Sequence, residues 1–423
     1  GITAVANPAS GSYNADEDGF DASSADLRLS AQINRAHGLR LSLLRSDTDY
    51  RFDSTPFPNP LGLNRLTSDA RGKTGLGHAT LQWDAQWLPQ WHATLTAGTS
   101  NEQSLGDYFR TTDGANGGTT QFNTSRRQAT WQNDITLDKD ILSLMLESRN
   151  ETVDSSTAYT VTSRDVRSAL VSYALNRPVW NALLVARNDE NSQFGNFNNW
   201  AVSGGYRMTD SLRVVASLGT SFQAPTFNQL YYPGFGNTAL VPQKNRATEL
   251  GLKYHSGDVS MGAVVYNNDI QGFIIPTTNV QSSLAVLRGV TLTGDVQAGD
   301  TTYSLSYDYA DPRSYSTSPA ANDLRLVRIA CNVFNARVTH QLGSFNVFGE
   351  LKVSGDREDN NLSFTGRDLL PGYTLLNLGV NWKLQKHVAL LGRINNLTDA
   401  QYNLANGFSM PGRNLFVSVN WTM

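Results

Sequence analysis

The segment His78-Ala-Thr-Leu-Gln-Trp-Asp-Ala-Gln-Trp87 alternates strictly between apolar and polar side chains. The apolar members all share one parity: Ala79, Leu81, Trp83, Ala85 and Trp87. Successive side chains of a β-strand point to opposite faces of the sheet, so a period of two predicts a strand with one apolar face and one polar face.

The same alternation recurs along most of the chain. It is clear in segments 142–147, 212–219, 345–353 and 415–423. About 19 segments meet the alternation criterion, many of them near 11 residues long. No apolar run approaches the roughly 18 residues that a transmembrane helix needs. The sequence therefore predicts an all-β protein.

Short and long connections also alternate between these segments. Short turns are expected at 35–38, 88–90, 137–140, 176–178, 209–211, 255–257, 298–300, 342–344 and 384–386. Longer loops rich in Gly, Asn, Ser, Pro and Asp are expected at 53–73, 104–124, 153–163, 223–245, 312–323, 356–368 and 398–412. Strict alternation places all short turns at one end of the sheet, which is the layout of an antiparallel up-and-down barrel.

The apolar face of such a sheet can meet either a protein core or lipid. Lipid is favoured because this many long hairpins would otherwise leave exposed edges. Tryptophans also gather near strand ends, as interfacial girdles do, at Trp83, Trp87, Trp91, Trp180, Trp382 and Trp421. The rival is a soluble sandwich, propeller or solenoid, but no repeat of 40–50 residues is evident. We therefore expect residues 1–423 to form a transmembrane β-barrel whose apolar residues, including Leu415, Val417, Val419 and Trp421, face outward.

Composition excludes several classes of function. Charged residues make up only 17% of the chain, below the roughly 25% of an average protein. The single cysteine, Cys331, excludes a disulfide framework and a cysteine-based metal site. A net charge of −3 gives no reason to expect a nucleic-acid partner. The six histidines are scattered and no catalytic motif is present, so we do not expect an enzyme.

One acidic segment suits a hard cation. Asp16 and Asp18 alternate around Glu17 and precede Gly19, and the next long loop offers acids at Asp47, Asp49 and Asp53. Alternate carboxylates followed by glycine are typical of calcium ligands. The alternative is a solvated acidic loop, which is common at protein surfaces.

The loop over 223–246 is too long to be a mere connection. It carries four aromatic residues close together: Phe227, Tyr231, Tyr232 and Phe235. Exposed rings at this position predict either ligand contacts or packing that orders the loop, and the residues alone do not decide between the two.

Two long motifs resemble those of TonB-dependent outer-membrane transporters. The first runs from Ser221-Phe-Gln-Ala-Pro225 through Leu230-Tyr231 and 237–242 to Glu249-Leu-Gly251. The second runs from Gly392-Arg-Ile-Asn-Asn396 to Tyr402 and continues through Gly407 and Pro411-Gly-Arg413. The resemblance covers nearly the whole chain, and it implies a 22-stranded barrel in the outer membrane of a Gram-negative bacterium.

Within that superfamily the chain is most similar to the cobalamin (vitamin B12) transporters. The similar stretches are 186–195, 268–270 and 306–311. The resemblance implies substrate contacts from Asn101, Gln103, Tyr231, Tyr232, Phe235 and Arg357. It also implies a calcium site with carboxylates at Asp16 and Asp18. Thr3, Arg51 and Asn64 stand where the family carries acids, and Asp53 is the residue that could compensate.

The family's plug domain, its TonB box and about three strands have no counterpart here, so the chain is expected to be a partial barrel of about 19 strands. The resemblance implies capture of a bulky nutrient by the long loops and uptake driven through TonB, by a monomer among outer-membrane lipid and lipopolysaccharide. The alternatives are a siderophore or haem receptor, a passive porin-like channel and a barrel protease. A protease would need a paired acid and histidine constellation, which the sequence does not offer.

Overall fold

The structure of the 423-residue chain is a computed structural model. The structure describes residues 5–6, 18–52, 54, 61–62, 68–276, 278–318, 322–363 and 365–422. Strands dominate this part of the chain, and its one α-helix, α1 (Phe227–Tyr231), is five residues long. None of its helices is long and apolar enough to cross a membrane.

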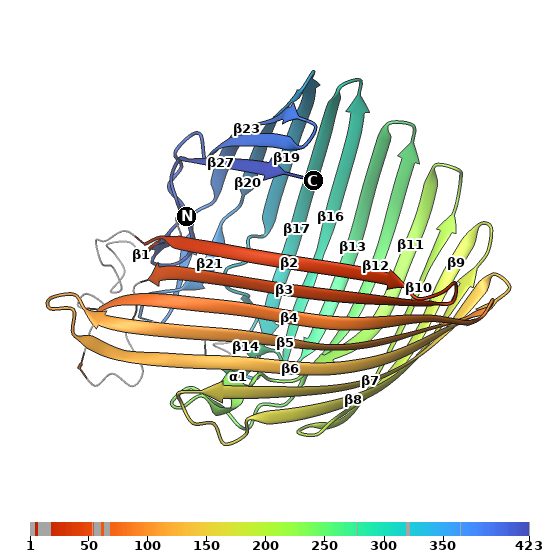
Figure 1. The fold of residues 1–423 in the computed structure, drawn as a ribbon. Coiled ribbons are helices and arrows are strands. Elements are labelled where there is room, and N and C mark those ends of the chain that lie inside the picture. The colour runs from red at the N-terminus through yellow and green to blue at the C-terminus, as the bar shows by residue number, and fades with distance from the viewer. Residues whose placement is uncertain are drawn as a thin grey trace.

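About 19 long strands form one antiparallel wall (Figure 1). They are β2 (Phe20–Gln32), β3 (His37–Phe52), β4 (Ser68–Leu88), β5 (Trp91–Arg110), β6 (Asn116–Leu137), β7 (Asp140–Ser155), β8 (Ser163–Asn176), β9 (Trp180–Asn191), β10 (Gly195–Arg207), β11 (Leu212–Gln223), β12 (Gln243–Ser256), β13 (Val259–Gln271), β16 (Leu284–Ala298), β17 (Thr301–Tyr315), β19 (Asn332–Leu342), β20 (Phe345–Ser354), β23 (Tyr373–Gln385), β24 (Val388–Asn395) and β27 (Asn414–Trp421).

Each wall strand pairs with its neighbours in chain order, which confirms the up-and-down topology. The ladder runs without a crossover from the β2–β3 pair to the β24–β27 pair and curls into a barrel. Nine short turns join the hairpins at one end, as the sequence predicts. Most connections at the other end are longer and carry the remaining short elements, but β9 and β10 are joined there by residues 192–194 alone.

The apolar face of the wall points outward. In the last strand, Leu415 is 71% exposed, and Val417, Val419 and Trp421 are each 65% exposed. Leu250 and Val265 face each other across β12 and β13 and are 52% and 48% exposed. A soluble barrel would bury such residues, whereas a lipid-facing wall displays them. The prediction of an outward apolar face is confirmed.

Aromatic side chains gather at the short-turn end of this face. Trp83 and Trp87 meet edge to face with ring centroids 5.7 Å apart, and Trp87 lies 6.4 Å from Trp91. Phe345 stacks on Trp382 across β20 and β23. These rings lie where the wall leaves the lipid, as an interfacial girdle requires.

One predicted loop is mostly strand. The segment 104–124 belongs to a hairpin in which β5 and β6 stay paired as far as Phe109 and Asn116. The apolar–polar alternation stops there because both faces of the hairpin have left the lipid and meet polar surroundings. The sequence therefore showed turn-like composition where the backbone is still fully paired.

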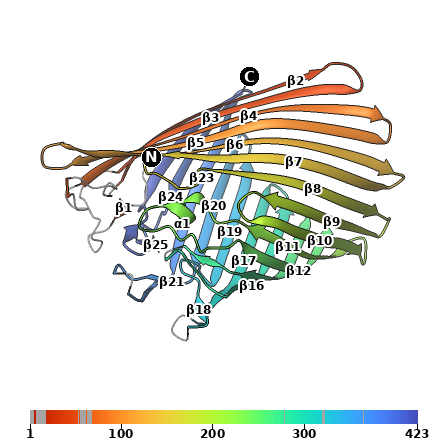
Figure 2. The ribbon, with the colours of Figure 1, turned by 90° about the horizontal axis from the view of Figure 1, so that it is seen from below.

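The long connections contain small elements that fold back over the lumen. Helix α1 lies inside the curve of the sheet (Figure 2). The others are the pairs β14–β15 (Ile274–Ile275 and Val280–Gln281), β21–β22 (Arg357–Asn360 and Arg367–Leu370) and β25–β26 (Asn403–Ala405 and Phe408–Ser409), with β1 (Val5–Ala6) beside β26 and β18 (Leu324–Arg325) beside β17.

Candidate substrate site

The segment after β11 is folded rather than loose. Thr226 caps helix α1 through a capping box, in which its hydroxyl accepts from the Gln229 amide and the Gln229 side chain accepts from the Thr226 amide. This exchange satisfies two amides that a short helix would otherwise leave unpaired. Leu230 packs against Leu240 and Ile274, and all three are at least 97% buried.

Asn279 ties this segment to the neighbouring β14–β15 hairpin. Its side-chain amide donates to the carbonyls of Gln229 (2.6 Å) and Phe235 (2.8 Å), and only 2% of the residue is exposed. Its φ of 53° lies in the left-handed region, which asparagine tolerates better than most residues. The hairpin and α1 therefore form one packed unit over the lumen.

Six aromatic rings cluster at the same mouth of the barrel. On the wall, Tyr50 lies 5.4 Å from Phe52, which lies 6.1 Å from Tyr108. A second group joins wall to loops, and it consists of Phe122, Tyr159 and Tyr232, with successive centroids 6.1 Å and 6.5 Å apart. The ladder places the wall rings on the polar, lumenal face of their strands. We call these six residues the aromatic cluster.

Three hydroxyls of this cluster, those of Tyr108, Tyr159 and Tyr232, are electrostatically connected. Burial and the nearby Tyr108 hydroxyl raise the pKa of Tyr232, and burial and Tyr232 raise the pKa of Tyr159. Tyr159 also donates to the Asn228 side chain in α1 at 2.6 Å. The phenols are therefore neutral at physiological pH, and they offer both ring faces and hydroxyl groups to a ligand.

One glycine allows a wall ring of this cluster to lie flat. Gly72 stands directly opposite Tyr50 in the β3–β4 ladder, and a Cβ at this position would overlap the Tyr50 ring. The ring fills the space of the missing side chain, which keeps it against the wall.

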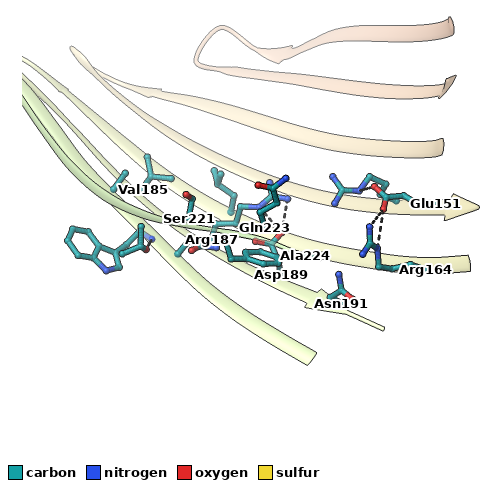
Figure 3. A pocket seen from close by; sticks show the side chains of 16 residues that line it. Glu151, Arg164, Val185, Arg187, Asp189, Asn191, Ser221, Gln223 and Ala224 are labelled. Carbon is teal, nitrogen blue, oxygen red and sulfur yellow. Dashed lines mark hydrogen bonds and ion pairs between the residues drawn. The ribbon is translucent and has the colours of Figure 1, made fainter. Parts of the chain in front are cut away.

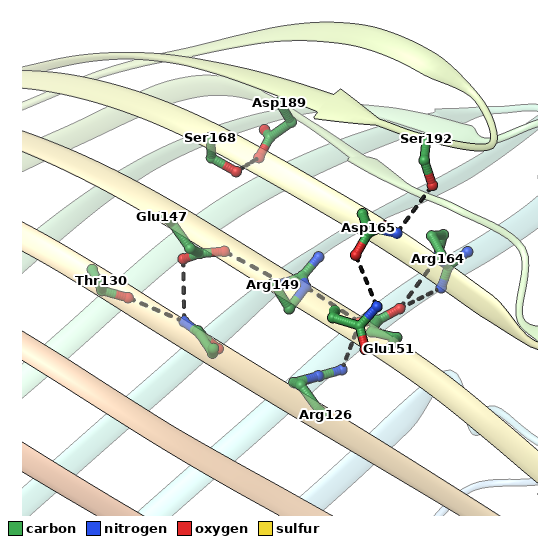
Figure 4. Close-up of polar contacts among 12 residues, drawn as sticks. Arg126, Thr130, Glu147, Arg149, Glu151, Arg164, Asp165, Ser168, Asp189 and Ser192 are labelled. Carbon is green, nitrogen blue, oxygen red and sulfur yellow. Dashed lines mark hydrogen bonds and ion pairs between the residues drawn. The ribbon is translucent and has the colours of Figure 1, made fainter.

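A ladder of charged side chains lies on the lumenal face of the wall around Glu151 (Figure 4). Glu151 receives Arg164 at 2.7 Å, Arg126 at 3.1 Å and Arg149 at 3.3 Å. One strand further on, Arg187 contacts Asp189 at 2.8 Å. The carboxylates are more buried than most of the arginines, with side-chain exposures of 13% for Glu151 against 55% for Arg126 and 28% for Arg149. The wall therefore exposes guanidinium groups to the lumen, and the carboxylates lie more deeply beneath them.

A cavity of about 470 Å³ lies along this ladder (Figure 3). It is lined by Arg149, Glu151, Arg164, Arg187, Asp189 and Asn191, and by the end of β11 up to Ala224. The cavity therefore lies between the charged wall and the start of the α1 segment.

The structure brings only some of the predicted substrate residues together. Tyr232 belongs to the aromatic cluster. Tyr231 packs against the Leu230 cluster and bonds the Gln193 amide through its hydroxyl, while Phe235 is 43% exposed. Arg357 lies in β21, is 7% exposed, and has its guanidinium over the Tyr373 ring at 5.3 Å.

Two of the predicted substrate residues lie on the other side of the wall. Asn101 and Gln103 have the same parity in β5 as Leu95 and Ala97, so they point outward. Gln103 lines a surface groove with Arg45 and Lys73 rather than the lumen.

Of the predicted metal ligands, Asp16 and Asp53 lie outside the described residues. Asp18 is half-buried just before β2. Asp47 pairs with Arg45, and Asp49 lies 3.8 Å from Lys73. Over the part of the chain that the structure describes, no three His, Cys, Asp or Glu side chains converge in a way that could hold a metal ion.

Sequence reasoning missed the wall residues of the site. Tyr50, Tyr108 and Phe122 come from three strands, and Tyr108 and Phe122 fall in the segment 104–124 that the sequence predicted as a loop. Tyr50 alone carried a signal, because an aromatic residue at a polar-face position of a lipid-facing strand departs from the pattern. Arg164 and Glu151 carried no local signal, because their pairing depends on the β7–β8 register.

An apolar belt outside, a charged lumen inside and folded loops over one mouth define an outer-membrane β-barrel with a capped lumen. The chain belongs to the TonB-dependent receptor-like β-barrel family, whose model matches residues 3–397. Members of this family are proteins of the Gram-negative outer membrane.

Similar proteins fall into two groups. A vitamin B12 transporter, BtuB, from Vibrio vulnificus is 29% identical over 282 residues, which cover 63% of this chain and 44% of the transporter. The chain thus matches less than half the length of that relative. Solved structures share the fold at lower identity. The siderophore receptor PirA of Acinetobacter baumannii has a TM-score of 0.76 at 13% identity, covering 96% of this chain and 71% of PirA. The ferric enterobactin receptor PfeA of Pseudomonas aeruginosa has a TM-score of 0.78 at 15% identity, covering 99% of this chain and 72% of PfeA.

Proposed function

We propose that this chain is the barrel of an active transporter that imports a scarce, bulky nutrient, with cobalamin as the first candidate and with energy delivered through TonB. It works as a monomer among outer-membrane lipid and lipopolysaccharide. The proposal is supported by the family and by the sequence similarity to a vitamin B12 transporter.

The aromatic cluster is the observation that carries the proposal. Six rings from β3, β5, β6 and two loops meet over the lumen. Flat, polarisable faces with hydroxyl groups suit a large conjugated ligand, because ring faces contribute stacking and hydroxyls fix orientation. A corrin ring offers such a surface.

A ferric siderophore or haem is the second candidate, since aromatic chelates present the same kind of surface. A passive porin-like channel is a weaker one, because α1 and its packed neighbours lie inside the curve of the wall. Titration of the full-length protein with cyanocobalamin, a ferric catecholate siderophore and haem distinguishes between these candidate substrates. Sub-micromolar binding of siderophore without cobalamin binding would replace the first candidate by the second.

Removing one loop ring should weaken binding of the substrate. For Tyr232→Ala we expect about a tenfold loss of affinity, equivalent to about 1.4 kcal/mol, because one stacking face of the cluster disappears. Isothermal titration of the full-length protein with cyanocobalamin measures it. Tyr254→Ala is the matched control, because Tyr254 is an exposed ring on the outward face near the short turns. Equal affinities in the wild type and Tyr232→Ala would remove the cluster from the binding site.

We also propose that calcium orders the loops near Asp18. Asp18 is the one proposed ligand among the described residues, so the proposal depends on the spacing of Asp16 and Asp18 and on Asp53 as a third carboxylate. Few acids predict modest affinity, with a Kd in the roughly 10⁻⁴–10⁻³ M range of extracellular sites.

Calcium removal should therefore weaken substrate capture. Without the ion, like charges repel and the loops open, so we expect chelator to lower substrate affinity in the wild type but not in Asp16→Ala/Asp18→Ala. Calorimetric titration with calcium alone gives a readout independent of substrate. Equal substrate affinity with calcium and with chelator would mean that the acidic segment is a solvated loop and not a calcium site.

A further inference from the structure

One arginine joins the barrel wall to the segment over the lumen. Arg164 is the second residue of β8, and its side chain is 11% exposed. Its Nε and Nη2 donate to the same oxygen of Glu151, at 3.1 Å and 2.7 Å. Its Nη1 donates in another direction, to the backbone carbonyl of Pro225 at 3.0 Å.

The same guanidinium also covers the first residue of the helix. Its carbon lies 5.1 Å from the centre of the Phe227 ring, and Phe227 is 7% exposed. Pro225 is almost fully buried. These two residues flank Thr226, the N-cap of α1. Arg164 therefore fixes the point at which the chain leaves the wall and turns over the lumen.

The other arginines on Glu151 make no comparable contact in the described part of the chain. Arg126 reaches the same carboxylate at 3.1 Å, but its side chain is 55% exposed and it comes from β6, two strands from β8 in the ladder. The charge on Glu151 is thus shared by three cations, and Arg164 is the one whose remaining donor and ring face are used on the loop.

We propose that Arg164 is a positioning residue that holds α1 over the lumen and so keeps Tyr232 in the aromatic cluster. Arginine suits this role because its planar fork donates in two directions and stacks on a ring at the same time, whereas a lysine ammonium is a compact point charge without a planar face. The role in substrate capture rests on the proposed function, but the effect on the segment itself does not.

Hydrogen–deuterium exchange of the full-length protein without substrate tests the proposal. We expect Arg164→Gln to speed amide exchange in 226–237 at least tenfold and Arg164→Lys to speed it less. The matched control Arg126→Gln, which removes another cation from the same carboxylate, should leave this segment unchanged. Exchange in β8 and β9 should stay at the wild-type rate in all three variants. Affinity for cyanocobalamin, or for the ferric siderophore if that binds instead, should fall about tenfold in Arg164→Gln alone.

Unchanged exchange in 226–237 for Arg164→Gln, or an equal rise in Arg126→Gln, would overturn the proposal. Should Arg164→Gln fail to fold, Arg164→Lys and Glu151→Gln decide in its place, and wild-type exchange in both would overturn it. Faster exchange in Arg164→Gln together with no binding of either ligand to the wild type would support the positioning role and reject the proposed function.

Discussion

Replacing Asp359 by alanine should release three extracellular connections at once. Asp359 is fully buried and accepts four hydrogen bonds: two from Arg328 Nε, each 3.0 Å, one from the Asn360 amide and one from the Asn406 amide. Arg328 belongs to the connection after β17, Asn360 to that after β20, and Asn406 to that after β24.

The expected cost is about 3–5 kcal/mol in the free energy of local opening, because a buried carboxylate network loses its acceptor. Arg328 also has a φ of 66°, a left-handed conformation that its neighbours must hold in place. We expect amide exchange in 324–331, 357–370 and 403–409 to rise together in Asp359→Ala, while the wall strands stay protected.

Glu358→Ala is the matched control for this prediction. Glu358 neighbours Asp359 in β21 and also pairs with an arginine, Arg367 at 2.7 Å, but its side chain is 30% exposed. A solvated ion pair contributes about 0–1 kcal/mol, so Glu358→Ala should change amide exchange in the three connections only slightly. If amide exchange in the three connections rose equally in both variants, or if it rose in only one connection in Asp359→Ala, then Asp359 would not hold the three connections together.

The strands of the wall could be predicted from the sequence because the apolar–polar alternation that defines each strand is a pattern of neighbouring residues. Each lipid-facing strand must alternate, and each short turn must break the alternation, so the direction of Leu415 or Val417 follows from parity alone. The prediction failed where the strands extend beyond the lipid and the alternation ends. Beyond the lipid both faces of the β5–β6 hairpin are polar, and the parity that would have revealed a strand at Tyr108 is lost.

The candidate site could be predicted only in part because its residues are far apart in the sequence and meet only in the folded barrel. The aromatic residues of the loop 223–246 predicted either ligand contacts or loop packing, and one of them, Tyr232, belongs to the aromatic cluster. The partners of that ring stand on β5 and in the connection after β7, more than 70 residues away in sequence. Asn101 and Gln103 were given by resemblance alone, and their parity in β5 directs them outward, so their contact with substrate stays a prediction.

The two buried polar networks of this protein differ in what positions their side chains. The wall ladder around Glu151 borders the lumen and needs a specific register of β6, β7 and β8. The Asp359 network lies in the loops and needs only that three connections meet. The first is set by the strand ladder and the second by loop packing, so substitutions in one should leave exchange in the other unchanged.

An arginine on the outer belt should be among the most damaging substitutions in the wall. Leu250 lies on the apolar face of β12, between Ala216 of β11 and Val265 of β13, and is 52% exposed. Near the middle of the bilayer a charged side chain on the lipid face costs about 2–4 kcal/mol. We expect Leu250→Arg to lower the free energy of folding into lipid vesicles by this amount, as measured by urea titration of the full-length protein.

Ser217→Arg on the neighbouring strand supplies the control, because it adds the same side chain to the lumenal face. Ser217 pairs with Glu249 in the β11–β12 ladder, and its hydroxyl lies 3.5 Å from that carboxylate. An arginine there stays in the polar lumen and gains an acidic neighbour, so its cost should be below about 1 kcal/mol. The lipid-facing assignment requires this order of costs, since exchanging the two faces of the wall would exchange the two values. Equal costs, or a larger cost for Ser217→Arg, would mean that the apolar face of this barrel does not meet lipid.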